Sequence, residues 1–265
     1  MLAFLEPELD AVPGTVSVWC APLGADGPRY ARAEQVPHYA ASTMKIAVLA
    51  AAHRAAEAGA VDLDAPVPVT DRFRSAAPGA PEYQLDRTPD DDPAVWDRLA
   101  GTAALRWLAE RMIVRSSNLA TNIVLGQVGI AAADREWTLA GARHSRIGRG
   151  IEDIAARTAG ITNEVTAADL AALLGALAAR DDPWPLDTLA AQEHRDDLAA
   201  GLPAGTRIAH KSGWVPGVRH SAAIVYPAGR SPYTLVVCTT TALPDAAARG
   251  LLARVAAASW AELVE

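Results

Sequence analysis

Hydrophobic and polar positions follow two different patterns along this chain. Near both ends, short runs rich in β-branched and aromatic residues are typical of strands. Between them, apolar residues recur every three or four positions, which is the period of a helix with one buried face. The strand pattern covers residues 15–20, 29–34, 207–211, 221–226 and 233–240. The helical pattern covers residues 1–12, 42–58, 102–115, 119–128, 131–140, 166–180, 186–200 and 245–264.

The order of these elements predicts the architecture. After a short N-terminal helix come two strands, a long series of helices follows, and three strands and one helix close the chain. Strands so distant in sequence form one layer only if the helical part is inserted between them. We therefore expect an α/β (α+β) fold with an all-helical insertion. The expected ranges are residues 1–38 plus 183–265 for the discontinuous α/β domain, and 39–182 for the mainly helical domain.

Composition narrows the possible partners. The 265 residues carry a net charge of −7 with 51% hydrophobic residues, which indicates a globular, acidic protein. Nucleic acids and anionic membranes call for a basic surface, so we expect neither as a partner. No apolar run reaches the roughly 18 residues that a membrane-spanning helix needs. We expect a monomer that acts on a small-molecule substrate.

The first residues of the chain and its two cysteines bear on the compartment and the redox state. The first residues carry acids and no basic region, so we expect no signal peptide and a cytoplasmic protein, unless a leader has been removed, in which case the protein is secreted or periplasmic. The two cysteines, Cys20 and Cys238, lie in strand-like runs and form no disulfide framework. We expect both to be free buried thiols, and we expect no metal and no cofactor.

Lysine is rare in this chain. Of 24 basic residues, 22 are arginine and only Lys45 and Lys211 are lysine. Arginine keeps its proton near neutral pH, whereas lysine can lose it when it is desolvated or close to another cation. The two lysines therefore mark candidate sites of proton-transfer chemistry.

Lys45 follows Ser42 by three residues at the start of an apolar helix. This spacing brings the two side chains to one face of the helix. A neutral lysine there can accept the proton of the serine, which is a weak nucleophile without a base. The free N–H groups at the helix start can stabilise an oxyanion. In the simpler alternative, Ser42 only caps the helix and both lysines are surface charges.

Two more short motifs occur in an order that suits the same chemistry. Ser116-x-Asn118 lies between two predicted helices, and Lys211-Ser212-Gly213 precedes a predicted strand. Each motif is weak evidence by itself because short patterns arise by chance. The combination of all three with suitable surroundings favours a Ser-Lys acyl-transfer enzyme.

With Ser42-x-x-Lys45, Ser116-x-Asn118 and Lys211-Ser212-Gly213, the chain resembles the penicillin-recognising serine enzymes, and within them it is most similar to class A β-lactamases. The likeness spans roughly residues 14–262 and includes the segments "RSSNLATNIVL" and "VTAADLAALL". The resemblance implies a serine β-lactamase/DD-peptidase-like fold, with an antiparallel sheet flanked by helices.

The resemblance also implies roles for individual residues. Ser42 would be the acylated nucleophile, Lys45 its proton partner and Ser116 the proton relay to the leaving nitrogen. Lys211 would be catalytic too, because it would tune the electrostatic field and bind the substrate carboxylate together with Ser212. Substrate binding would also use Asn118, Gly213 and the backbone of Trp214, whose N–H completes the oxyanion hole with that of Ser42. Arg219 or His220 could add a second contact to the substrate carboxylate, although both could equally be ordinary hairpin residues.

The match fails at the loop that carries the deacylating glutamate in class A enzymes. Their pattern is R-x-E-x-x-x-N, and alignment on Arg149 puts Ile151 at the glutamate position. Glu152 is one residue late, and the loop is short for the family. Glu152, Asp153 or, less favoured, Glu164 could replace the missing base, and we select Glu152 as the catalytic candidate.

Three functions remain open on this basis. The first is a β-lactamase-like serine hydrolase that acts through a Ser42 acyl-enzyme. The second is a D-alanyl peptidase or esterase of the same superfamily, which the missing glutamate favours. The third is a non-hydrolysing sensor of β-lactams or peptidoglycan fragments, which the intact Ser-Lys pair disfavours.

Overall fold

The structure is a computed structural model that describes residues 2–90 and 92–264. Backbone contacts divide the chain into two units. Unit 1 comprises Met1–Thr43, Ala140–Ser145 and Glu164–Glu265, and unit 2 comprises Met44–Leu139 and Arg146–Asn163. This division differs from the expected ranges because the helix after Thr166 packs on the sheet of unit 1.

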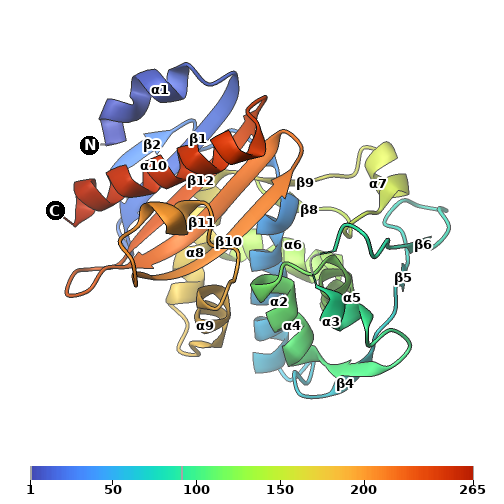
Figure 1. Cartoon of the computed structure of the whole chain (residues 1–265). Coiled ribbons are helices and arrows are strands. Elements are labelled where there is room, and N and C mark those ends of the chain that lie inside the picture. The colour runs from blue at the N-terminus through green and yellow to red at the C-terminus, as the bar shows by residue number, and fades with distance from the viewer. Residues whose placement is uncertain (1, 91, 265) are drawn as a thin grey trace. The chain divides into compact units, whose positions relative to one another are not determined.

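Unit 1 contains a five-stranded antiparallel sheet (Figure 1). Its strands are β1 (Gly14–Pro22), β2 (Tyr30–Arg32), β10 (Arg207–Val215), β11 (Val218–Tyr226) and β12 (Tyr233–Thr241), in the order β10-β11-β12-β1-β2. The N-terminal strand β1 pairs along its whole length with β12. The predicted discontinuous layer is thus confirmed, together with the antiparallel sheet.

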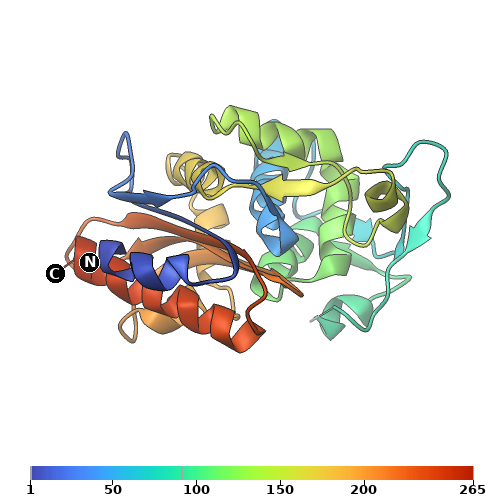
Figure 2. The same cartoon turned by 90° about the horizontal axis from the view of Figure 1, so that it is seen from above.

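Helices cover both faces of this sheet (Figure 2). The long helix α10 (Asp245–Leu263) lies on one face beside η1 (Leu2–Leu5) and α1 (Glu6–Asp10), and α8 (Ala167–Ala178) lies on the other. Alternate strand residues therefore enter different cores, and Val16, Val18 and Cys20 join the cluster under α10. Burial on both faces explains why these strands read as nearly continuous apolar runs rather than as alternating ones.

Unit 2 is built around the buried helix α2 (Lys45–Glu57). Every residue from Lys45 to His53 is buried, and α2 contacts α4 (Leu105–Val114), α5 (Asn118–Val128) and α6 (Ile130–Leu139). Only small elements interrupt its long loops. They are β4 (Pro66–Pro68), β5 (Arg72–Phe73), β6 (Tyr83–Gln84), α3 (Pro93–Trp96), β7 (Thr102–Ala104), β8 (Arg146–Ile147) and α7 (Ile154–Thr158).

The remaining described elements are short. The short helix η2 (Ala41–Met44) runs directly into α2, β3 (His38–Tyr39) pairs with β9 (Asn163–Val165), and α9 (Trp184–Ala190) precedes η3 (Leu198–Gly201). Thr166 caps α8 by accepting a hydrogen bond from the backbone of Asp169, as its sequence pattern predicts.

Three sequence expectations on element boundaries are wrong. Residues 102–104 form β7 rather than the start of a helix, because they pair with β4. Strands β10 and β11 extend to Val215 and Val218, and a turn at Pro216-Gly217, where Gly217 has φ +81°, joins them. Residues 191–197 are not helical, and the side chains of Gln192 and Asp196 bond to Ser212 on β10 and to Arg219 on β11.

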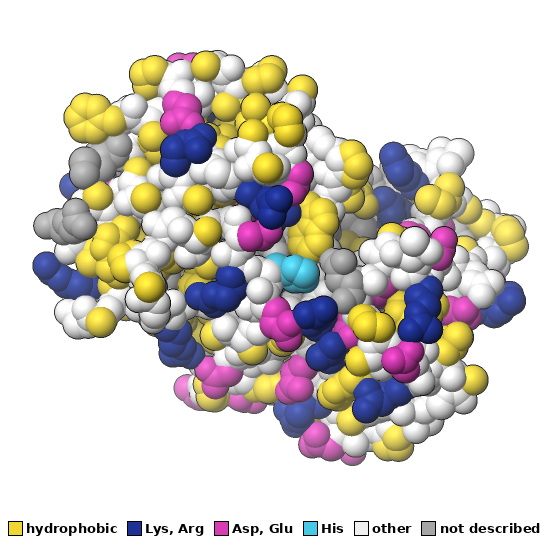
Figure 3. Space-filling view, viewed as in Figure 1, with side chains coloured by type: hydrophobic (Ala, Val, Ile, Leu, Met, Phe, Trp, Pro, Cys, Tyr) yellow, Lys and Arg dark blue, Asp and Glu magenta, His cyan; other side chains and the backbone are white. Residues whose placement is uncertain are grey.

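Both cysteines are free and buried, as expected. Burial raises the pKa of the Cys20 thiol to about 12 and raises that of Cys238 further, so neither is a reactive thiolate near neutral pH. On the face shown in Figure 3, acidic and basic side chains are interspersed among the described residues. Among the described helices, none is both long and apolar enough to cross a membrane.

Candidate active site

The amine of Lys45 joins the first and second motifs within unit 2. Lys45 is fully buried at the first turn of α2, and its Nζ donates to the Ser116 carbonyl oxygen at 2.6 Å and to Asn118 Oδ1 at 3.0 Å. The Ser116 hydroxyl lies 3.3 Å from the same Nζ. A buried amine is stable only with such partners. Lys45 is therefore an internal, oriented group and not a surface charge.

Ser116 holds an unusual backbone conformation. Its φ is +58°, a left-handed value that costs about 1–2 kcal/mol for a residue with a side chain. The strain occurs where α4 ends and Ser117 caps α5 by accepting a hydrogen bond from the Ala120 backbone. This sharp turn directs both the Ser116 carbonyl and the Ser116 hydroxyl toward Lys45.

Ser42 lies on η2, the last segment of unit 1 before the chain enters unit 2. It is half-buried, and Thr43 beside it donates its hydroxyl proton to the Ala40 carbonyl at 2.6 Å. Gly213 of the third motif comes very close to this turn. A Cβ built on Gly213 would lie 2.8 Å from Ser42 N and 2.9 Å from Thr43 N. The glycine thus brings β10 into contact with the backbone of the candidate nucleophile.

Lys211 is the second fully buried lysine and lies on β10. Its Nζ donates to Gln192 Oε1 and to the Ser212 carbonyl oxygen, both at 2.8 Å. Ser212 is tied to the same amide oxygen through its backbone N–H at 3.1 Å. The third motif is thus held by a glutamine that none of the sequence motifs contains.

Trp214 follows the third motif, and its indole ring is in contact with His194 and Arg219, both in unit 1. The His194 ring packs edge-on against it with centroids 5.0 Å apart, and the Arg219 guanidinium carbon lies 5.1 Å from its ring centre. Beside it, a cavity of about 410 Å³ is lined by residues of the β10–β11 hairpin and the start of α10.

Arg219 and His220, the two candidates for a second contact to a substrate carboxylate, both bond to protein groups. Arg219 pairs with Asp196 at 2.8 Å, Asp245 at 3.3 Å and Asp197 at 3.4 Å. His220 is fully buried, with Nε2 donating to the Tyr39 carbonyl and Nδ1 accepting from the Thr239 N–H. Burial lowers the pKa of His220 to about 4, so its ring is neutral at pH 7.

Hydrogen bonds between its own residues hold the two ends of the loop from Arg149 to Asn163 together. Asn163 bonds to the backbone of Gly148 and Arg149, and the Arg149 side chain donates to the Ile161 carbonyl at 3.1 Å. Ile151 is fixed through its backbone, because Asn122 accepts from its N–H at 2.8 Å and donates to its carbonyl at 3.0 Å. The apolar residue at the expected glutamate position is firmly held.

The three carboxylate candidates differ in their surroundings. Asp153 is fully buried and accepts from Ser75, Ala76 and Ala156, so its carboxylate caps α7 and fixes a loop. Glu164 lies on β9 in unit 1, paired with Tyr39.

Glu152 belongs to unit 2 and is half-buried, with φ +60°. Its carboxylate accepts from the Asp86 N–H at 3.2 Å and from the Asn118 side chain. Burial raises the pKa of Glu152 above its usual value, and the charges of Asp86 and Asp90 act in the same direction. A carboxylate with a raised pKa beside a motif residue has the properties of a general base.

Sequence reasoning missed Gln192, Asn122 and Asn163. Asn122 follows Asn118 by four residues on α5 and so shares a helix face with it, a signal that was present but unspecific. Gln192 and Asn163 carry no local signal, because their partners are distant in the chain.

Comparisons with known proteins show the family and the fold of the chain. The model of the beta-lactamase enzyme family matches residues 3–263. A β-lactamase from Streptomyces fradiae is 29% identical over 179 residues, 63% of this chain and 58% of that protein. The match therefore spans a little over half the length of that relative.

Two solved structures show the same fold. An engineered variant of the class A β-lactamase of the last common ancestor of Gram-negative bacteria has a TM-score of 0.84 at 24% identity, covering 100% of this chain and 98% of that chain. A PBP-A mutant, solved as its acyl-enzyme complex with penicillin-G, has a TM-score of 0.79 at 22% identity, covering 98% and 95%. At such identities the likeness establishes the fold alone. The family match over nearly the whole sequence goes further: this chain belongs to the beta-lactamase enzyme family.

Proposed function

We propose that the protein is a serine hydrolase of β-lactamase type that forms an acyl-enzyme at Ser42 with β-lactams or related amides and esters. The observation that carries this proposal is the buried Lys45 amine, bonded to Ser116 and Asn118 three residues after a half-buried serine. A protein that only binds its ligand has no need of such an oriented amine.

In the proposed acylation, Ser42 Oγ attacks the substrate carbonyl carbon while the neutral Lys45 amine takes its proton. The backbone N–H groups of Ser42 and Trp214 stabilise the oxyanion. The C–N bond then breaks, and Ser116 relays the proton from Lys45 to the leaving nitrogen. Lys211 and Ser212 bind the substrate carboxylate, and Asn118 binds its side-chain amide.

Deacylation requires a base that activates water. Ile151 has no such group, and the Asp153 carboxylate already accepts three hydrogen bonds. We assign the role to Glu152, whose carboxylate is half-buried beside Asn118. Water then attacks the ester carbonyl while Glu152 takes its proton. The bond between the acyl carbon and Ser42 Oγ breaks, and the proton held by Glu152 passes to Ser42 Oγ.

A second candidate function is supported by Ile151 itself. Its backbone is held from both sides by Asn122, so the loop presents an apolar side chain at the position of the family glutamate. Slow attack by water on the acyl-enzyme would suit a D-alanyl peptidase or esterase that transfers its acyl group to a different acceptor.

Intact-protein mass spectrometry separates these functions. Benzylpenicillin is mixed with the protein and sampled from seconds to hours, with Ser42→Ala as the control. A β-lactamase gives a transient adduct with continuing drug loss, and a peptidase or sensor gives a long-lived adduct. An adduct that persists in Ser42→Ala, or no adduct in the wild type, contradicts the proposal.

A further inference from the structure

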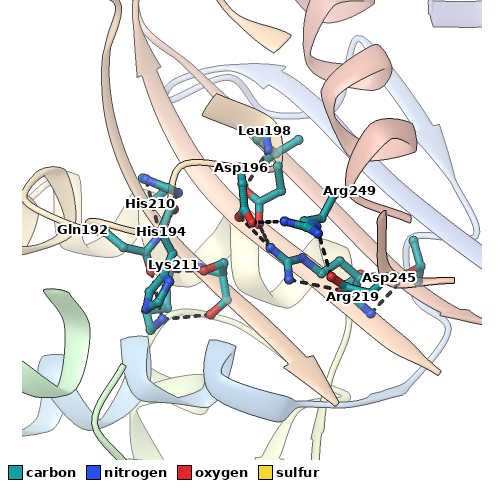
Figure 4. A network of polar contacts seen from close by, with 12 residues as sticks. Gln192, His194, Asp196, Leu198, His210, Lys211, Arg219, Asp245 and Arg249 are labelled. Atoms are coloured by element: carbon teal, nitrogen blue, oxygen red, sulfur yellow. Dashed lines mark hydrogen bonds and ion pairs between the residues drawn. The ribbon is translucent and has the colours of Figure 1, made fainter. Parts of the chain in front are cut away.

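Side chains of the segment 191–197 contact residues of β10 and β11 in unit 1, and Figure 4 shows part of this network around Gln192, Lys211, Asp196 and Arg219. Gln192 bonds to Lys211 and Ser212, His194 packs on Trp214, and Asp196 pairs with Arg219. A segment with no regular structure thus supports successive positions of β10 and β11. The contact nearest the start of the segment joins Gln192 to Lys211.

Gln192 is 2% exposed, and both ends of its amide are in use. Oε1 accepts from Lys211 Nζ at 2.8 Å, Ser212 N at 3.1 Å and Ser212 Oγ at 3.4 Å. Nε2 donates to His210 Nδ1 at 2.8 Å and to the His194 carbonyl at 3.2 Å. These partners fix which end of the amide faces the lysine.

The protonation of His210 agrees with this orientation. Burial, and then the positive charge of Lys211, lower the pKa of His210 to about 3. A neutral ring leaves Nδ1 free to accept the proton of the Gln192 amide. Arg195 and His194 also act on this ring, and both disfavour a second positive charge there.

A carboxylate at position 192 would meet these contacts differently. It could still accept from Lys211 and Ser212, but it could not donate to His210 and would place a negative charge 2.8 Å from the amine. Opposite charges at that distance shift proton affinities strongly. With a neutral amide at position 192, the proton affinity of Lys211 is therefore not raised by a negative charge on this neighbour.

We propose that Gln192 is a positioning residue that fixes the Lys211 ammonium through a neutral amide, so that the positive charge of the lysine remains available to an anionic group of the substrate. The link to substrate rests on the proposed function above; the link to the amine rests only on contacts within unit 1.

Lysine NMR tests the proposal directly, because the chain contains only two lysines. Protein labelled with ¹³C,¹⁵N-lysine gives two side-chain amine signals, which Lys211→Arg assigns. In Gln192→Glu we expect the titration of Lys211 to move upward by about one pH unit or more. In Gln192→Met, which removes the acceptor from a buried charge, we expect it to move downward.

The same variants are then acylated with benzylpenicillin and with its uncharged methyl ester. Gln192→Glu should lower the second-order acylation rate of the anionic drug about tenfold, the equivalent of one pH unit in proton affinity. The ester should be affected far less, since only the carboxylate senses the lost charge. A loss through general damage to the fold would slow both compounds equally.

Gln35→Glu is the matched control, because Gln35 is exposed in unit 1 and the change of charge is the same. An unchanged Lys211 titration in both Gln192 variants, or shifts of equal sign, overturns the proposal. If Gln192→Met fails to fold, Gln192→Glu alone decides. If the wild type forms no Ser42 adduct, the proposed function fails, while the lysine titration still decides the role of Gln192.

Discussion

At the scale of single residues, the two carboxylates of the 149–163 loop show how neighbours assign roles. Asp153 accepts hydrogen bonds from two backbone N–H groups and one hydroxyl, so its charge is satisfied inside the structure. Glu152, next to it, accepts from Asp86 and Asn118 and has a pKa raised by burial. Proton uptake by Glu152 is therefore easier than for an ordinary surface glutamate, which is what a general base requires.

Glu152→Gln should leave acylation of Ser42 intact and lengthen the lifetime of the acyl-enzyme about 100-fold, because general bases contribute at least that factor. The measurement is the decay of the penicillin adduct by mass spectrometry after removal of free drug. Glu164→Gln, a change on β9, serves as the control. Equal adduct lifetimes in Glu152→Gln and the wild type would move the base to another group.

At the scale of elements, the close approach of β10 to η2 depends on one missing side chain. Gly213 is not in a left-handed conformation, so its requirement is spatial rather than conformational. Any Cβ there would lie closer to the backbone nitrogens of Ser42 and Thr43 than van der Waals contact permits. The short third motif therefore ends in glycine for packing reasons.

Gly213→Ala should lower the free energy of unfolding by about 1–3 kcal/mol, the usual cost of overpacking, and should also slow Ser42 acylation. Urea denaturation and the penicillin adduct rate measure the two effects. Gly126→Ala is the control: a Cβ at Gly126 meets nothing within 4 Å, and alanine favours the helix. Stability equal to the wild type in Gly213→Ala would show that η2 moves away without cost.

At the scale of the whole molecule, stability depends on pH through buried charges. Burial raises the pKa of Asp197 from 3.8 to about 6, although the charge of Arg219 opposes it. The folded state thus binds this proton more tightly than the unfolded state. Its contribution to stability is complete below about pH 4, falls as the pH rises to about 6, and is constant above.

Asp197→Asn should remove this dependence. The stability of the wild type relative to Asp197→Asn should fall by roughly 3 kcal/mol between pH 4 and pH 6, since two pKa units correspond to about that energy. Denaturation curves of both proteins at matched pH values cancel the other titrating groups. A difference that stays constant with pH would mean that Asp197 titrates normally in the folded protein.

Much of this protein could be predicted from the sequence, because periodicity and motif spacing are local properties. The strands at residues 15–20 and 233–240, the helix after Ser42 and the capped helix after Thr166 follow from neighbours in the chain. The three motifs likewise identified Lys45, Ser116 and Asn118 as candidates, and the structure brings these three together.

Only the tertiary structure decided what depends on distant partners. Residues 191–197 have a helical pattern, yet hydrogen bonds to Lys211, Ser212 and Arg219 hold them in an irregular path. Contacts between distant residues also account for the ion pairs of Arg219, the hydrogen bonds between Asn122 and the Ile151 backbone and the surroundings of Glu152. Each joins residues separated by more than ten positions, and no local pattern encodes which of them will meet.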